Sequence, residues 1–235
     1  LSSKNLVFTT PSIWCKDQFL NILKKYNKNN TKLPKVFVIG NVVDFKKNKN
    51  LIKKNKFKLI PKSEFVTLFH YEKKNNYVKA YDYLFKLLQK LNNQKKFKYF
   101  IIFGNNSKKF PAHKFNNLIF YDFGFIENKR IDEIYKLADA FILTSRQETF
   151  SQLTADSLIN NTPVIAFNVS GHKELIIHKK NGFLAKHSSI DDLIKGMKYF
   201  EKNDFKNIQD LKNFSQKKFY NNHLKKVYAE DNFKN

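Results

Sequence analysis

The chain has 235 residues, of which 42% are hydrophobic and 16% aromatic, and it carries a formal net charge of +24. This apolar content suffices for a sizeable core, which argues against intrinsic disorder, and the length fits one large α/β domain or two small ones. No apolar run reaches the roughly eighteen residues of a membrane-spanning helix, and the single cysteine, Cys15, excludes an internal disulfide and favours a cytosolic protein.

The N-terminal segment is expected to hold two short strands and one helix. An apolar run at residues 6–8 predicts a strand, and Ser12 opens a helical pattern. Residues 36–40 predict a second strand that ends in a turn. Residues 44–58 are rich in Lys and Asn without a clear period, so a loop is expected there.

From residue 65 onward, short apolar runs alternate with longer amphipathic segments. Strands are expected at residues 65–69, 99–104, 118–121, 140–144, 163–167 and 183–185, and helices at 77–91, 131–138, 150–160, 173–178 and 190–200. Near-continuous apolar strands separated by helices indicate a parallel sheet covered on both faces. Right-handed crossovers then give a doubly wound, Rossmann-like α/β fold, in which ligands bind beyond the carboxyl ends of the strands. The last residues, from about 203 to 235, predict a charged helical C-terminal tail.

Residues 144–158 carry the strongest chemical signal, because they follow a predicted buried strand and open a helix. Thr149 and Gln152 fit a capping box, which predicts a helix that begins near Phe150. The first turn of such a helix has unpaired backbone N–H groups and a positive dipole end. The segment therefore predicts a site for an anion such as a diphosphate.

Two acidic residues flank this predicted anion site. Glu148 stands just before the helix, and Asp156 stands on its second turn, where its side chain leans back toward the N-terminus. Carboxylates beside a phosphate site make sense if they accept hydrogen bonds from sugar and ribose hydroxyls. The alternative is that Glu148 is a surface acid and Asp156 a solvent-facing helix residue.

Other chemistries lack their motifs in this sequence. The six histidines show no close metal-ligand spacing and one cysteine makes no zinc site, so no metal is expected. Neither a P-loop nor a G-x-G-x-x-G motif occurs, which disfavours a P-loop ATPase and a dehydrogenase. The high positive charge has three interpretations: codon bias with a solvated surface, an anionic membrane or phosphate-bearing ligand, and a nucleic acid. The even spread of the lysines favours the first, and no nucleic-acid partner is expected.

The residues from 139 to 184 resemble the donor-binding domain of GT-B-fold, retaining glycosyltransferases of the family-4 type, the glycosyl transferases group 1. The family pattern has an acid, then Phe-Gly, and a second acid eight residues after the first, matched here by Glu148, Phe150-Ser151 and Asp156. Further matches are residues 121–125, 134–139, 162–166, 170–174 and 181–184, and the resemblance covers about residues 64–200. Ser151 and Ser170 stand where the family has Gly, which narrows the freedom of the backbone.

The resemblance implies a division of labour within the site. Glu148 would act in catalysis by contacting the hydroxyls of the donor sugar, and Asp156 would bind the ribose. The diphosphate would be held by the segment that begins at Thr149, through the backbone amides of Phe150, Ser151 and Gln152. Gly124 and Phe125 would lie beside the nucleobase.

The family also carries a basic pair after the first strand of this domain, an Arg followed by a Lys before Gly. Here Lys74 matches the Lys, Lys73 is an alternative, and the Arg is absent, with His70 near its place. Phosphate binding is therefore assigned to Lys74 and Lys73.

The implied function is a hexosyltransferase-type retaining glycosyltransferase that transfers a sugar from a nucleoside-diphosphate sugar to a glycan or lipid-linked acceptor, without cofactor or metal, in polysaccharide or lipopolysaccharide biosynthesis. Residues 1–32 would end an N-terminal acceptor domain or linker, residues 33–202 would form the donor-binding domain, which is the C-terminal half of a GT-B fold, and residues 203–235 the tail. With the rest of the acceptor domain missing, the chain alone would bind donor without transferring it.

A cytoplasmic protein, peripheral at the inner face of an anionic membrane, is expected. Two alternatives remain: a non-catalytic nucleotide-sugar-binding module and a basic nucleic-acid-binding protein.

Overall fold

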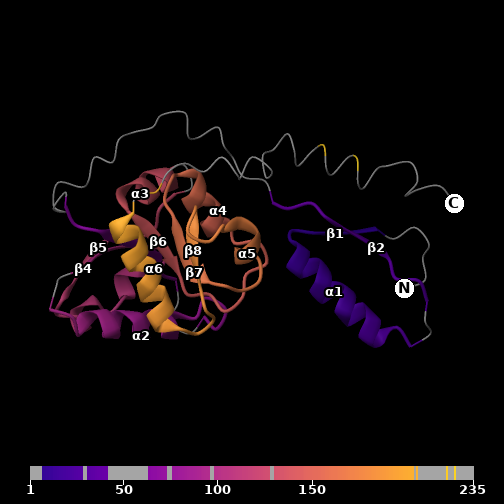
Figure 1. Ribbon diagram of the computed structural model, residues 1–235, viewed down its shortest axis with the longest axis horizontal. Helices are drawn as coiled ribbons and strands as arrows, with labels where there is room; N and C mark the ends of the chain where they lie inside the picture. The colour runs from indigo at the N-terminus through magenta and orange to yellow at the C-terminus, as the bar shows by residue number, and fades with distance from the viewer. Residues whose placement is uncertain are drawn as a thin grey trace.

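The computed structural model describes residues 7–28, 31–41, 63–72, 76–95, 98–127, 130–203 and 205, together with Asn221 and Lys225. Its first unit pairs strand β1 (Val7–Thr10) with strand β2 (Lys35–Val38) in parallel, and helix α1 (Ile13–Tyr26) connects them. Figure 1 shows this unit in indigo, with one end of α1 beside helix α5 of the larger unit. The strands and the helix predicted from the sequence are thus present here.

The larger unit is built on a six-stranded parallel sheet. Its strands are β3 (Val66–His70), β4 (Lys98–Phe103), β5 (Leu118–Asp122), β6 (Ala140–Leu143), β7 (Val164–Phe167) and β8 (Gly182–Ala185). They lie in the order β5-β4-β3-β6-β7-β8, and every adjacent pair is parallel. The chain therefore starts in the middle, builds outward to β5, returns to β6 and builds outward again. This is the doubly wound arrangement expected from the sequence, with its topological switch point between β3 and β6.

Helices cover both faces of the sheet, as the uninterrupted apolar strands require. On one face α2 (Tyr81–Asn92) and α6 (Ile190–Lys202) pack on side chains such as Phe69, Phe100 and Ile165. On the other face lie α3 (Ile131–Leu137), α4 (Gln152–Ile159) and α5 (His172–Leu175), packed on Leu68, Phe141 and others. Figure 1 shows α6 in front of the strands, with α2 at its lower end. Because alternate residues of each strand point to opposite faces, each strand contributes to both cores.

Much of the aromatic content lies in the core beneath α2. Phe110 follows β4 in a segment with two short 3-10 helices, Ser107–Lys109 and Ala112–Lys114. Its ring stacks on Phe85 with centroids 5.5 Å apart and packs edge-on against Tyr71 at 5.2 Å. Such aromatic pairs contribute about 0.5–1.5 kcal/mol each beyond the area they bury. These contacts hold in place the backbone at Tyr71, directly after β3.

Several boundaries differ from the expectation. Helix α2 begins at Tyr81 rather than at residue 77, because Ala80 adopts a left-handed backbone with φ of 51° and ends the pattern. Helix α4 begins at Gln152 rather than near Phe150, because Ser151 has φ of 67°. Helix α5 covers only residues 172–175 instead of 173–178. The predicted loop at 44–58, and all of the predicted tail except residues 203, 205, 221 and 225, lie outside the described residues.

Across the described ranges, none of the helices combines the length and the apolar character needed to cross a bilayer.

Candidate functional site

A small pocket lies at the switch point between β3 and β6. Its polar lining comes from His70, the last residue of β3, from Lys79 in the segment after β3, and from Thr144 and Ser145 after β6. The remaining lining residues are apolar and come from the strands and from α2 and α4. A pocket at the carboxyl ends of strands that diverge in topology is the expected ligand site of this fold class.

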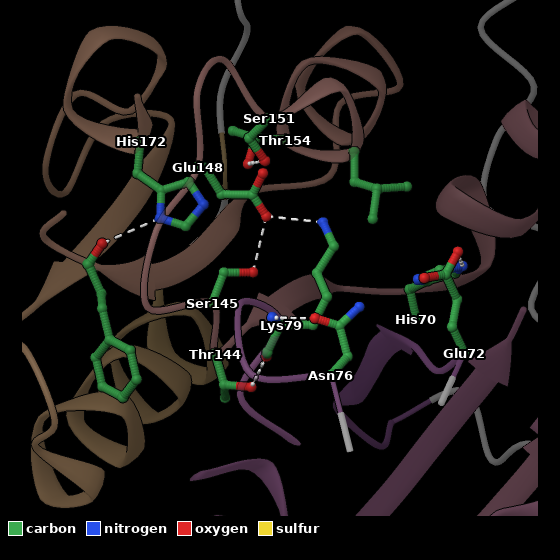
Figure 2. Close-up of polar contacts among 12 residues, drawn as sticks. His70, Glu72, Asn76, Lys79, Thr144, Ser145, Glu148, Ser151, Thr154 and His172 are labelled. Carbon is green, nitrogen blue, oxygen red and sulfur yellow. Dashed lines mark hydrogen bonds and ion pairs between the residues drawn. The ribbon is translucent and has the colours of Figure 1, made fainter. Parts of the chain in front are cut away.

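Glu148 lies beside this pocket with its side chain only 10% exposed. One of its oxygens, Oε1, accepts a hydrogen bond from Lys79 Nζ at 2.8 Å and another from Ser145 Oγ at 2.8 Å. Figure 2 shows both donors converging on that oxygen. A carboxylate that is this buried needs partners, and the lysine charge and the hydroxyl supply them. No described group donates to the second oxygen, Oε2, so it can accept a hydrogen bond from a ligand.

Lys79 is held in place by the backbone that surrounds it. Its N–H donates to Asn76 Oδ1 at 3.0 Å, and its carbonyl accepts from Thr144 Oγ1 at 3.3 Å. The same hydroxyl also donates to the carbonyl of Ala80 at 3.2 Å. The end of β6 therefore fixes the segment that carries Lys79, and the lysine side chain points across the switch point toward Glu148 (Figure 2).

Arg146 adds a second connection between these two segments. Its backbone N–H donates to the carbonyl of Val78 at 2.8 Å, and its guanidinium donates to the carbonyl of Tyr77 at 2.9 Å. The guanidinium also lies 4.7 Å from the ring centroids of both Tyr77 and Tyr83 and donates to Asp82 at 2.6 Å. The hydrogen bond to Asp82 raises the pKa of Arg146 further above its already high ordinary value. Arg146 thus braces the two segments that meet at Glu148.

The N-terminus of α4 differs in detail from the predicted capping box. Ser151 is the N-cap in a left-handed conformation, without a side-chain bond to the helix backbone, and its hydroxyl pairs with Thr154 Oγ1 at 2.8 Å. The capping-box prediction for Thr149 and Gln152 was therefore wrong, because the turn at Ser151 displaces Thr149 from the capping position. A helix N-terminus still faces the side of the sheet where Glu148 lies, and its first N–H groups have no intrahelical acceptor.

Asp156 and Gln152 interact along α4. Gln152 Nε2 donates to Asp156 Oδ1 at 3.0 Å, which directs the carboxylate one turn back toward the N-terminus of the helix. Asp156 is half-buried and Gln152 exposed, whereas Phe150 is buried in the core at 2% exposure. Of these three side chains, the two polar ones are accessible to a ligand.

Two histidines that flank this region, one buried and one half-buried, each have a ring nitrogen without a hydrogen-bond partner within the described chain. His172 is fully buried; its Nδ1 lies 3.2 Å from the carbonyl of Phe167, and its Nε2 has no hydrogen-bond partner within the described chain. Because a carbonyl only accepts, Nδ1 carries the proton. Burial lowers the pKa of His172, opposed by the nearby charge of Glu148, and Figure 2 shows its unpaired nitrogen directed toward Glu148. Burial lowers the pKa of His70 as well.

The other residues predicted for the site lie apart from Glu148. Gly124 follows β5 with φ of 69°, and its carbonyl accepts from Gly104 N at 2.8 Å. Phe125 beside it is 68% exposed. Since β4 and β3 lie between β5 and β6, these residues lie along the same edge of the sheet as Glu148 but with two strands in between. Lys73 and Lys74 lie outside the described residues.

Within the part of the chain that the structure describes, no group of three or more His, Cys, Asp or Glu side chains could hold a metal ion. Cys15 is a half-buried thiol whose Sγ lies 3.8 Å from the carbonyl oxygen of Thr149.

Comparison with known proteins decides the family. The sequence model described as "Glycosyl transferases group 1" matches residues 53–218, which span the whole six-stranded sheet and its helices. The chain belongs to the glycosyl transferases group 1 family. This is the family that the motif around Glu148 indicated.

Three proteins illustrate this similarity. An uncharacterized 41.2 kDa protein in the cps region of Klebsiella pneumoniae is 25% identical over 150 residues, which is 64% of this chain and 38% of that protein. The lipopolysaccharide outer core galactosyltransferase WaaB superposes with a TM-score of 0.69 and 17% identity, over 94% of this chain and 61% of WaaB. The pneumococcal O-GlcNAc transferase GtfA, solved in complex with UDP and GlcNAc, has a TM-score of 0.61 and 16% identity, over 97% of this chain and 46% of GtfA.

These likenesses show the GT-B type of fold, of which the six-stranded sheet is one Rossmann-like half. The chain spans between 18% and 38% of the length of the curated relatives that it matches.

Sequence reasoning missed the lysine that contacts Glu148. Lys79 immediately precedes Ala80, whose positive φ is the conformation that glycine adopts most readily. Lys79-Ala80 is therefore a second place where a Lys precedes a residue in a glycine-like conformation. The signal was present in the sequence as a Lys followed by a small residue directly before a helical run. His172 carried no sequence signal, because its burial beside Glu148 results only from the fold.

Proposed function

We propose that this glycosyltransferase chain forms the donor-binding part of a retaining, family-4-type hexosyltransferase, which transfers a sugar from a nucleoside-diphosphate sugar to a glycan or lipid-linked acceptor. The observation that carries the proposal is the position of Glu148. It is a buried carboxylate, paired through one oxygen with Lys79 and Ser145, beside the pocket at the switch point. Its other oxygen is available to accept a sugar hydroxyl.

The proposed roles follow the chemistry of the side chains around the pocket. Glu148 orients the donor sugar, and Asp156, directed toward the N-terminus of α4, accepts from the ribose. The backbone from Thr149 to Gln152 binds the diphosphate, since N–H groups and the positive end of the helix attract anions. Gly124 and Phe125 lie by the nucleobase. Lys79 takes the phosphate role that the sequence assigned to Lys73 and Lys74.

Lys79 has two electrostatic tasks in this proposal. In the free protein its ammonium group neutralises Glu148, which lowers the cost of burying a carboxylate near a diphosphate site. When the bond between the sugar and the diphosphate breaks, negative charge grows on the leaving diphosphate. A lysine and a helix N-terminus fixed in advance stabilise that charge without reorganisation, so no bound metal is needed in this scheme.

A binding panel tests the proposal directly. Isothermal titration with UDP, GDP, CMP and their sugar conjugates should show one preferred nucleotide, and UDP is the first to try because GtfA was solved with it. Glu148→Gln should weaken the sugar conjugate relative to the free nucleotide, because only the conjugate offers hydroxyls to Oε2. Glu133→Gln, at an exposed acid of α3, is the matched control. If millimolar concentrations of every nucleotide and conjugate give no heat, the proposal is wrong.

The net charge of +24 supports a further part of the proposal, a lipid-linked acceptor reached at an anionic membrane surface on the cytoplasmic side. Flotation with vesicles of neutral lipid, with and without phosphatidylglycerol, measures this. Binding to the anionic vesicles that weakens with added salt is expected. Equal recovery with both kinds of vesicle would remove the membrane from the proposal and leave a soluble glycan as the acceptor.

A further inference from the structure

Each backbone N–H group at the start of helix α1 donates a hydrogen bond, and two of these bonds go to an acceptor in the larger unit. Cys15 N–H donates to Ser12 Oγ at 3.2 Å, and Lys16 N–H donates to the carbonyl of Ser12 at 3.1 Å. The N–H groups of Ile13 and Trp14 have no such acceptor within α1. They donate instead to the carboxylate of Glu174, at 3.0 Å and 3.1 Å, from 161 and 160 positions away in the sequence.

Each oxygen of the Glu174 carboxylate thus accepts one N–H of the first turn. Helix α1 has no acidic residue of its own in that turn. A carboxylate there interacts favourably with the positive end of the helix dipole and makes charge-assisted hydrogen bonds. Glu174 is therefore the capping acid of a helix that belongs to the other structural unit, and Figure 1 shows the two helices meeting at that point.

The helix that carries Glu174 packs directly on the backbone of the proposed donor site. Gly171 N–H, at the start of α5, donates to the carbonyl of Glu148 at 2.9 Å. A Cβ atom on Gly171 would lie 2.6 Å from the carbonyl oxygen of Thr149, so only glycine permits this approach. The same oxygen of Thr149 is 3.8 Å from Cys15 Sγ. One short stretch of backbone, residues 148–149, therefore touches both α5 and α1.

We propose that Glu174 is a positioning residue, which docks the unit of β1, α1 and β2 against the backbone that carries Glu148, and that sugar transfer depends on this docking. The inference rests on the proposed function, in which the larger unit binds the donor and the unit of β1, α1 and β2 lies on the acceptor side. Glu174 makes no contact with the donor in this scheme. It fixes the geometry between the two sides of the reaction, where a misplacement of about 1 Å can cost roughly 100-fold in rate.

Two substitutions break the contact from opposite sides. Glu174→Gln removes the charge and one of the two acceptors. Ile13→Pro removes one donor without touching Glu174. Proline is tolerated at the first position of a helix, and Ser12 before it is already extended, with φ of −151° and ψ of 160°. Ile13→Ala keeps the N–H and alters only the side chain, and Lys173→Gln changes an exposed neighbour on α5, so these two variants are the controls.

The single tryptophan of the chain, Trp14, reports the docking without an activity assay, because its own N–H is one of the two donors. We expect its fluorescence emission to move to longer wavelength in Glu174→Gln and in Ile13→Pro, and to stay unchanged in both controls. In the complete enzyme, the same two variants should lower kcat for transfer by at least about 10-fold. Their Kd for the nucleotide should stay within about twofold of the parent value, because the donor site itself is intact.

The outcomes separate the two proposals. Parent-like kcat in either Glu174→Gln or Ile13→Pro, with nucleotide binding intact, overturns the role of Glu174. A lowered kcat with a matching loss of nucleotide affinity also overturns it, since Glu174 would then support the donor site rather than the docking. If the parent protein itself neither binds a nucleotide nor cleaves a sugar conjugate, the proposed function fails, while the Trp14 emission still shows whether Glu174 holds α1.

Discussion

The ion pair between Lys79 and Glu148 should contribute measurably to stability, unlike the exposed ion pairs of this protein. Its side chains are 23% and 10% exposed, with Nζ and Oε1 2.8 Å apart. Exposed pairs contribute about 0.2–1 kcal/mol, and breaking a fully buried pair costs about 3–5 kcal/mol. Because this pair lies between those limits and Glu148 keeps its bond to Ser145, we expect a coupling free energy of about 2 kcal/mol.

A double-mutant cycle measures that coupling. Lys79→Met, Glu148→Gln and the double variant would be unfolded in urea at pH 7.5, where Lys79→Met alone leaves a buried carboxylate without its counter-charge. With a slope of about 2 kcal/mol per M, Lys79→Met should lower the midpoint by about 1 M, and Glu148→Gln should rescue most of that loss in the double variant. The pair of Lys90 and Asp191, 51% and 69% exposed, is the control cycle.

A coupling no larger than that of the control pair would refute the reasoning, because the charge of Lys79 would then be screened by solvent. The same variants carry a prediction for binding. Glu148→Gln should lower the Kd for the free nucleoside diphosphate about fivefold or more. Without the charge of Glu148, Lys79 is free to make a charge-assisted hydrogen bond with phosphate. Lys79→Met should weaken it by a similar factor.

Three further predictions concern single positions. Burial lowers the pKa of His172 from its ordinary value of 6.5. Below pH 6.5, His172 therefore becomes protonated in the unfolded chain while it stays neutral in the folded chain. Stability should therefore fall by up to about 1.4 kcal/mol per pH unit as the pH drops from 6.5 toward the folded pKa; urea unfolding at pH 7.5 and 5.5 should show a smaller loss in His172→Asn, and an equal loss would contradict this. Ser170 has φ of 43°, a left-handed backbone conformation that is strained for a residue with a Cβ. Ser170→Gly should therefore stabilise the fold by about 0.5–1 kcal/mol and raise Tm by a few degrees, whereas a lower Tm would show that the backbone at Ser170 is not strained. Gly171→Ala should destabilise by about 1–3 kcal/mol and reduce nucleotide-sugar binding, because its Cβ would displace the carbonyl of Thr149, and unchanged calorimetric binding and Tm would argue against that packing.

The amino-acid sequence alone determined the fold class, and it predicted the edge of the sheet at which the pocket lies. Uninterrupted apolar strands separated by amphipathic helices admit few arrangements other than a parallel sheet covered on both faces, and its ligand site then lies at the carboxyl ends of the strands. The spacing of Glu148, Phe150 and Asp156 identified the family pattern, because that pattern lies within nine consecutive residues and needs no long-range contact.

The tertiary structure decided what surrounds Glu148. Lys79, Ser145 and His172 reach it from three different segments, which only the strand order β3-β6-β7 brings together. The helix boundaries at Tyr81 and Gln152 were predicted wrongly because Ala80 and Ser151 adopt left-handed backbone conformations. Residues with a Cβ rarely adopt this conformation, so the residue types at these positions do not predict it. The capping of α1 by Glu174, across 160 residues, was likewise invisible in the sequence, because a hydrogen bond between distant segments leaves no period or spacing in the chain.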